Sequence, residues 1–109
     1  MSTLRQATHE DILQMARRIA EAAKPVKIIL FGSRARGSAH PNSDVDLLVI
    51  ERDPVVQYHE AIRLRSLLRD FKVPIDIVVF GQAFAERYGD IPGTVLYPAF
   101  REGKVLYGG

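Results

Sequence analysis

The spacing of apolar residues changes along the chain from a helical period to short continuous runs, and these changes locate the predicted elements. Apolar side chains recur every three or four positions after Thr8, a predicted N-cap with Asp11 three positions later, until Pro25 ends the pattern. Residues 26–31 then form a mainly apolar run with two adjacent isoleucines. We therefore predict a helix that ends before Pro25, followed by a buried strand over residues 26–31.

The middle of the chain repeats this change of period. A second strand is predicted from Asp44 to Ile50, and a third over residues 74–80, where β-branched side chains surround a single charge. Between these strands, Asp53 and Pro54 are typical of an N-cap and a first helical turn. They predict a helix that extends from this point to about Asp70.

The C-terminal part has a weaker periodic signal. Pro92 is suited to start a short helix that runs through Arg101 and Glu102 and is stopped by Gly103, before residues 105–107. The predicted order is therefore helix, strand, turn, strand, helix, strand and a helical tail. Without an internal repeat or a low-complexity linker, this order predicts one α/β domain over residues 1–109.

Composition restricts the class of protein. The 109 residues are 47% apolar and 26% charged, which is typical of a globular domain and excludes a disordered chain. No window approaches the roughly 20 apolar residues that a membrane span needs, and the N-terminal residues lack the apolar core of a signal peptide. We therefore expect a cytoplasmic protein without a membrane partner.

Two further features of the composition exclude other chemistry. The chain has no cysteine, which excludes disulfides, zinc-thiolate sites and thiol nucleophiles. Its three histidines show no spacing typical of metal ligands. The net charge of +2 is small and the basic residues are dispersed, so nucleic acid is not expected as a direct partner.

The first candidate site is the turn after residues 26–31. Gly32 and Ser33 stand where a buried strand opens into a turn or a helix start, and the first backbone N–H groups of a helix have no partner within it. Such groups bind phosphate. Gly32 and Gly37 have P-loop spacing, but Ser38 follows where that motif needs lysine, and a Gly-x-Gly dinucleotide fingerprint is missing.

The second candidate site is a set of three carboxylates. Asp44 and Asp46 are two positions apart on a strand, so their side chains project from the same face while Val45 points to the other. Asp76 lies inside the third predicted strand, which a crossover helix could place beside the second. Three carboxylates can hold two Mg²⁺ ions about 3.5–4 Å apart, so this pattern indicates a magnesium-nucleotide site.

Each of these residues also has a structural interpretation. Asp44 and Asp46 could lie on a solvated strand end, Gly32 could be a simple turn residue, and Asp76 could be a charge that protects an edge strand. Arg34 and Arg36 could be solvated, and His40 a loop residue or a contact to nucleotide or acceptor. The combination of a glycine-serine turn with three acids in strand phase favours the site over these separate explanations.

These residues resemble a known family. Gly32 and Ser33, ten further residues, Asp44-x-Asp46 and a later Asp76 resemble the nucleotidyltransferase superfamily that includes DNA polymerase beta. The small size, the turn sequence GSRARG and the ending REGKVLY resemble minimal nucleotidyltransferases, which are often antitoxins paired with a HEPN-type ribonuclease toxin.

The resemblance implies a fold and an activity. It implies a mixed sheet flanked by helices, with Ser33 and the turn amides on the β- and γ-phosphates and Asp44 and Asp46 as ligands of Mg²⁺. Asp76 would be the third metal-site acid and the base. The implied reaction transfers AMP from ATP to a tyrosine of the toxin and releases pyrophosphate, with the toxin as a hetero-oligomeric partner.

Residue chemistry indicates two further roles. A guanidinium can pair with two phosphate oxygens, so Arg34 or Arg36 is expected to face the departing pyrophosphate. The region around four aromatic residues would contact a partner, or these side chains would pack under the C-terminal tail: Phe84, Tyr88, Tyr97 and Phe100.

Two other functions remain open on the sequence alone. One is a binding module that neutralises a toxin by occlusion, without catalysis. The other is a transferase that acts on a small molecule or an RNA end.

Overall fold

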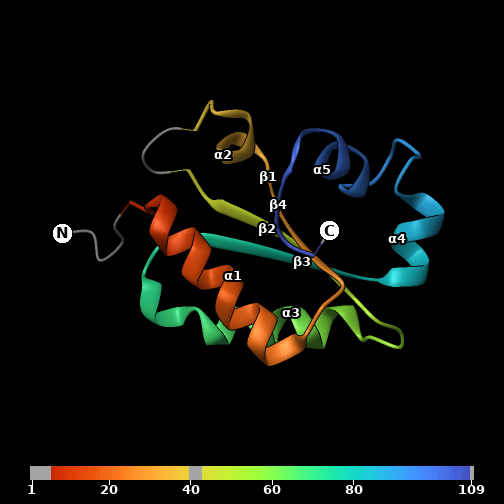
Figure 1. The fold of residues 1–109 in the computed structure, drawn as a ribbon, viewed down its shortest axis with the longest axis horizontal. Helices are drawn as coiled ribbons and strands as arrows, with labels where there is room; N and C mark the ends of the chain where they lie inside the picture. Colours follow the sequence, from red (N-terminus) through yellow and green to blue (C-terminus); the bar gives the residue numbers. More distant parts are fainter. Residues whose placement is uncertain (1–5, 40–42, 109) are drawn as a thin grey trace.

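A four-stranded mixed sheet forms the centre of the molecule in the computed structural model, which describes residues 6–39 and 43–108 (Figure 1). The strand order is β3-β2-β1-β4. The strands are β1 (Lys27–Phe31), β2 (Val45–Glu51), β3 (Ile75–Gly81) and β4 (Lys104–Tyr107).

The pairing of the strands brings their polar ends together. β1 is antiparallel to both β2 and β4, whereas β2 and β3 are parallel, with Asp46 opposite Asp76 and Phe31 opposite Asp46. The amino ends of β2 and β3 therefore meet the carboxyl end of β1 at one end of the sheet. A parallel pair needs a crossover connection, and α3 (Gln57–Leu67) with the 3₁₀ turn η1 (Arg69–Phe71) supplies it.

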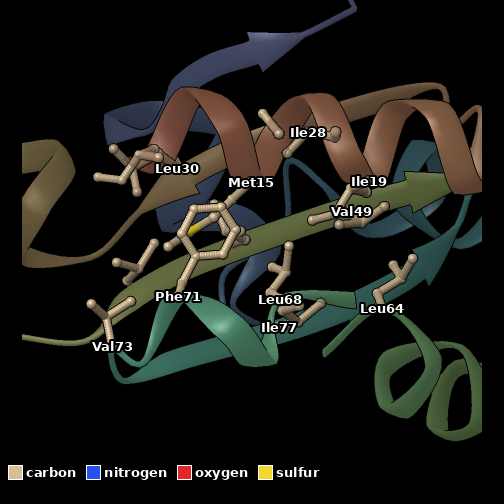
Figure 2. Close-up of a cluster of buried hydrophobic side chains, with 14 of the residues drawn as sticks. Met15, Ile19, Ile28, Leu30, Val49, Leu64, Leu68, Phe71, Val73 and Ile77 are labelled. Carbon is tan, nitrogen blue, oxygen red and sulfur yellow. The ribbon is translucent and has the colours of Figure 1, made fainter. Parts of the chain in front are cut away.

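One face of the sheet is covered by α1 (His9–Ala23), α3 and η1 (Figure 1). Figure 2 shows the core between them, in which Met15 and Ile19 of α1 lie over the sheet together with Phe71 of η1. The predicted N-cap of α1 is confirmed: Asp11 N donates to Thr8 Oγ1 at 3.0 Å and Thr8 N donates to Asp11 Oδ2 at 2.9 Å.

The other face is covered by two short helices, α4 (Gln82–Tyr88) and α5 (Leu96–Glu102). They enclose a second apolar cluster that alternates along the strands with the first: Ile29, Leu48, Ile50, Ala85, Leu96 and Ala99. A fifth α-helical segment, α2 (Ser33–Arg36), directly follows β1. Among the described helices, none is long and apolar enough to cross a membrane.

The predicted start of the crossover helix is wrong. α3 begins at Gln57, and Asp53 instead accepts a hydrogen bond from Ala83 N at 2.8 Å, at the start of α4. Asp53 therefore caps a helix 30 residues away in sequence. Gly81 makes room for this contact, since a Cβ there would lie 2.2 Å from Asp53 Oδ1. At its other end α3 stops at Leu67, and the predicted last turn is the 3₁₀ turn.

The predicted C-terminal helix is also wrong in extent. It begins at Leu96 rather than at Pro92, although it ends at Glu102 before Gly103 as expected. α4 was not predicted, because seven residues contain too few turns to show a helical period. Residues 104–107 form β4, and this strand depends on pairing with β1, which lies far away in sequence.

Candidate active site

The turn between β1 and α2 requires glycine at position 32. Gly32 has a φ of +74°, and its carbonyl oxygen accepts hydrogen bonds from Ala35 N at 3.1 Å and Arg36 N at 3.2 Å. A Cβ on Gly32 would also lie 2.3 Å from Asp46 Oδ2. Because glycine has no side chain, it can adopt this positive φ and it leaves the space that the Asp46 carboxylate occupies. Ser33 is the first residue of α2 and is half-buried.

The three predicted acids lie at one end of the sheet. Asp46 and Asp76 are direct neighbours across the parallel β2–β3 pair, and Asp44 is one residue before β2. Val45 and Leu47 belong to the core under α1 and α3, so the acids alternate with them toward the opposite face. Asp46 is half-buried, whereas Asp44 and Asp76 are exposed.

Electrostatics couple these carboxylates. The pKa of Asp46 is raised, first by burial, then by the negative charge of Asp76, and then by that of Asp44. Arg34 and Arg36 lower this pKa and offset part of the effect. An ionised Asp46 is therefore unfavourable in this environment, and a cation between the acids would relieve the repulsion.

The carboxylates suit Mg²⁺ by type and by register, but they are not grouped as a formed metal centre. Among residues 6–39 and 43–108, no three histidine, aspartate or glutamate side chains are close enough together to hold a metal ion. Asp46 lies against Gly32, and Asp76 Oδ1 is 3.6 Å from Arg65 Nη2 on α3. Hard oxygen donors on neighbouring strands are the ligand set that Mg²⁺ prefers, with water and phosphate completing its shell.

Arg34 binds the protein backbone. Its Nε and Nη2 donate to the carbonyl oxygen of Ser43 at 3.2 and 2.9 Å, and its Nη1 donates to the carbonyl oxygen of Ala7 at 3.5 Å. The guanidinium therefore ties α2 to the residue before Asp44 and to the segment that precedes α1. This arrangement holds the acidic end of β2 beside the glycine turn.

Arg36 is freer than Arg34. Its side chain is 49% exposed, and its Nη1 lies 3.7 Å from Glu102 Oε2 at the end of α5. At that distance in solvent the ion pair is weak, so Arg36 can exchange Glu102 for another anion. His40 lies outside the described residues.

The four aromatic residues that the sequence singled out pack mainly on the α4–α5 side. Phe84 stacks on Phe80 with ring centroids 5.1 Å apart and lies 4.6 Å from the Tyr88 ring. The guanidinium of Arg101 lies 4.4 Å from the centroid of the Tyr97 ring, and Phe100 is half-buried.

One buried carboxyl group has no signal in the sequence. Glu51, the last residue of β2, is only 9% exposed, and its Oε2 has no hydrogen-bond partner among the described residues. Burial first, and then Glu60 on α3, raise the pKa of Glu51 to about 8. Hydrogen bonds from Arg63 first, and then Glu51, lower the pKa of Glu60 to about 2. The charge pattern of α3 gave no sign of this pairing, because Glu51 ends an apolar strand.

Comparison with known proteins identifies the class to which this fold and site belong. The sequence matches the family of nucleotidyltransferase domains over residues 12–94. The chain is therefore a member of the nucleotidyltransferase domain family. A comparison with curated proteins found no match.

Solved structures show the same fold. The chain is 27% identical to a protein in the crystal structure of a toxin–antitoxin with AMP-PNP, covering 94% of this chain and 75% of that one with a TM-score of 0.57. A structure from Sulfolobus solfataricus assigned as a nucleotidyltransferase is 17% identical, with 91% and 78% coverage and a TM-score of 0.62. The toxin–antitoxin MntA–HepT gives 20% identity, 94% and 74% coverage and a TM-score of 0.61.

These matches bear on the expectations from the sequence. The polymerase beta-like nucleotidyltransferase fold, with a small mixed sheet flanked by helices, is confirmed. The resemblance to minimal nucleotidyltransferases is confirmed at the level of family and fold.

Proposed function

We propose that residues 1–109 act as one Mg²⁺-dependent nucleotidyltransferase domain, which transfers AMP from ATP to a tyrosine of a HEPN-type toxin and so serves as its antitoxin. The main support is the in-register pairing of Asp46 with Asp76 beside Gly32, since a half-buried carboxylate between two others calls for a cation. The 27% identical protein with AMP-PNP supports an adenine nucleotide, and its toxin–antitoxin setting supports a toxin partner.

The acids and the turn have different tasks in this reaction. Asp44, Asp46 and Asp76 would hold Mg²⁺, which when bound neutralises the triphosphate and lowers the pKa of the attacking hydroxyl. Ser33 and the first amides of α2 orient the β- and γ-phosphates. Arg34 keeps the acidic end of β2 in place through the Ser43 carbonyl. Arg36 leaves Glu102 to face the departing charge.

The chemistry is an in-line displacement at the α-phosphorus. The acceptor oxygen forms a bond to this phosphorus, the bond between it and the α,β-bridging oxygen breaks, and pyrophosphate leaves with the bond electrons. The proton of the acceptor hydroxyl passes to Asp76. No covalent enzyme intermediate forms, so the rate acceleration comes from positioning of the reactants and neutralisation of their charge. We place the reaction in the cytoplasm, where Mg-ATP is available.

The test compares ATP labelled on the α- or the γ-phosphate in the presence of the toxin partner. We expect label from α-labelled ATP on a partner tyrosine, none from γ-labelled ATP, and none with Asp44→Asn or Asp46→Asn. Full labelling by both variants would overturn the proposal. If variants that transfer no label still neutralise the toxin at a stoichiometric ratio, the protein acts by occlusion instead. Labelling of RNA ends or small molecules in the absence of the partner would establish a different acceptor.

A further inference from the structure

A basic hollow lies next to Asp76, at the edge of the molecule where α3 meets β3. It encloses about 330 Å³. Its lining combines three cations with aliphatic side chains: Arg65, Arg69, Lys72, Ile62, Leu68 and Ile75. Arg65 on its lining lies 3.6 Å from Asp76, so this edge of the molecule adjoins one acid of the candidate active site.

The cations of this hollow are in excess over nearby acids. Within the described residues, neither Arg69 nor Lys72 makes an ion pair or a side-chain hydrogen bond. The acid between them in sequence, Asp70, is bound by Arg18 instead, with Nη2 to Oδ2 at 2.9 Å. Two exposed positive charges are therefore left for an external anion.

A second hollow of about 330 Å³ continues along the same edge. It is lined by Tyr58 and Ala61 of α3 and by four consecutive residues of β3, 77–80. Tyr58 is 74% exposed and Ile62 is 47% exposed. β3 is an edge strand of the sheet in the described part of the chain, so its outer backbone groups are available to an added strand.

We infer that this edge, formed by the two hollows and named here the α3–β3 surface, is where the acceptor protein docks. The surface binds an extended segment of the acceptor protein, whose acidic side chains contact Arg69 and Lys72 and whose apolar side chains pack beside Tyr58. This inference rests on the proposed function, because its adjacency to Asp76 is what brings an acceptor hydroxyl to the acids.

The lining favours a protein segment over RNA. Of the residues that the structure describes, no aromatic one lines the hollow that carries the cations, and Tyr58 and Phe80 line the second hollow instead, whereas single-stranded nucleic acid is typically held where cations and aromatic platforms for its bases lie together. The free edge of β3 also offers main-chain hydrogen bonds, which an extended peptide can complete. The net charge of +2 supplies little general attraction for a polyanion, so binding has to come from the local cations.

A random copolymer of glutamate and tyrosine is a suitable probe, because it offers carboxylates and acceptor hydroxyls together. Its binding is measured by fluorescence anisotropy at several salt concentrations. The test variant is Arg69→Glu with Lys72→Glu. The matched control is Arg17→Glu with Lys104→Glu, which removes one exposed arginine and one exposed lysine elsewhere and changes the net charge equally.

We expect the test variant to bind the copolymer about tenfold more weakly than the wild type, with a shallower salt dependence, and the control to change by less than about twofold. Equal weakening in both variants, or in neither, would overturn the inference. Tighter binding of single-stranded RNA through Arg69 and Lys72 would also overturn it.

A second readout separates this inference from the proposed function. Wild-type protein with α-labelled ATP is expected to label the tyrosines of the copolymer, and the test variant is expected to do so with a raised KM for the copolymer and an unchanged KM for ATP. The binding pattern without any labelling would support the α3–β3 surface and count against the proposed function.

Discussion

The carboxylate of Asp46 occupies the space that a side chain at the position of Gly32 would need, since a Cβ there would lie 2.3 Å from Asp46 Oδ2 and 3.2 Å from its Cγ. The glycine therefore does two things, since it also adopts a φ of +74° that favours residues without a side chain. Gly37 at the end of α2 is a partial control: its φ is nearly the same, +75°, and no atom lies within 4 Å of a Cβ there, but its ψ is 13° whereas that of Gly32 is −158°.

Gly32→Ala is expected to lower the free energy of unfolding by about 2–4 kcal/mol, because the backbone cost and the displacement of Asp46 add. Gly37→Ala should cost only the strain of a side chain in its own left-handed conformation, about 1–2 kcal/mol. Urea denaturation of both variants measures the difference. Nucleotidyl transfer should fail in Gly32→Ala and persist in Gly37→Ala. Equal destabilisation of the two would show that Asp46 yields freely and that the close contact has no role.

Asp46→Asn is expected to lower the rate of nucleotidyl transfer by about 100-fold or more, without a loss of stability. The pKa of Asp46 is raised, so its ionised form is unfavourable in the folded state at neutral pH, and removing that charge relieves burial and repulsion from Asp76 and Asp44. The midpoint of thermal unfolding without Mg²⁺ should therefore stay constant or rise.

The matched control for this variant is Asp70→Asn. A hydrogen bond from Arg18 lowers the pKa of Asp70, so its ionised form stabilises the fold and its removal should lower the unfolding midpoint. A lower midpoint for Asp46→Asn as well would mean that Asp46 is a structural group, and would remove the main support for a cation site.

The sequence predicted the parts of this site that depend on local pattern. Asp44, Asp46 and Asp76 alternate with core residues such as Val45 and Leu47, and a period of two fixes which sheet face they share. The β1–turn–α2 unit was also predictable, because the apolar run ends at a glycine.

The sequence could not predict contacts between distant segments. Asp53 has the local character of an N-cap for α3, but its side chain caps the start of α4. Only the parallel pairing of β2 with β3 brings Asp53 and the start of α4 together. β4 depends in the same way on β1. Arg34 and Arg36 look equivalent in the sequence, and the fold alone separates them.

Arg34 and Arg36 should therefore respond differently to replacement by methionine. Arg34→Met removes three hydrogen bonds to the carbonyl oxygens of Ser43 and Ala7, and is expected to lower the free energy of unfolding by about 1–3 kcal/mol. It should also lower kcat, because the acidic end of β2 loses its anchor. Circular dichroism melts and steady-state kinetics with ATP measure both effects.

Arg36→Met should leave the unfolding midpoint nearly unchanged, since its pair with Glu102 is 3.7 Å long and exposed. It should raise the KM for ATP instead. Glu102→Gln provides the complementary test: it frees Arg36 and is expected to lower that KM slightly. A large loss of stability in Arg36→Met, or no loss in Arg34→Met, would contradict the assignment of roles.

Glu51→Gln is expected to stabilise the protein at neutral and alkaline pH. Because burial and Glu60 raise the pKa of Glu51 to about 8, above the value near 4.5 of an unperturbed glutamate, its contribution to stability is full below pH 4.5 and is lost as pH rises toward 8. Replacement by a neutral amide removes this loss, for a gain of about 1–2 kcal/mol at pH 8 and little change near pH 4. Thermal unfolding between pH 4 and pH 9 measures it.

Glu60→Gln is the opposite case on the facing helix. Arg63 donates to Glu60 at 2.7 and 2.8 Å and lowers the pKa of Glu60 to about 2, so its stabilising contribution is present above pH 4.5 and is lost as pH falls toward 2. This variant should therefore be less stable than the wild type at pH 7. If Glu51→Gln also destabilised the protein at pH 8, the Glu51 carboxyl would have to be ionised and favourably paired there, and its raised pKa would be disproved.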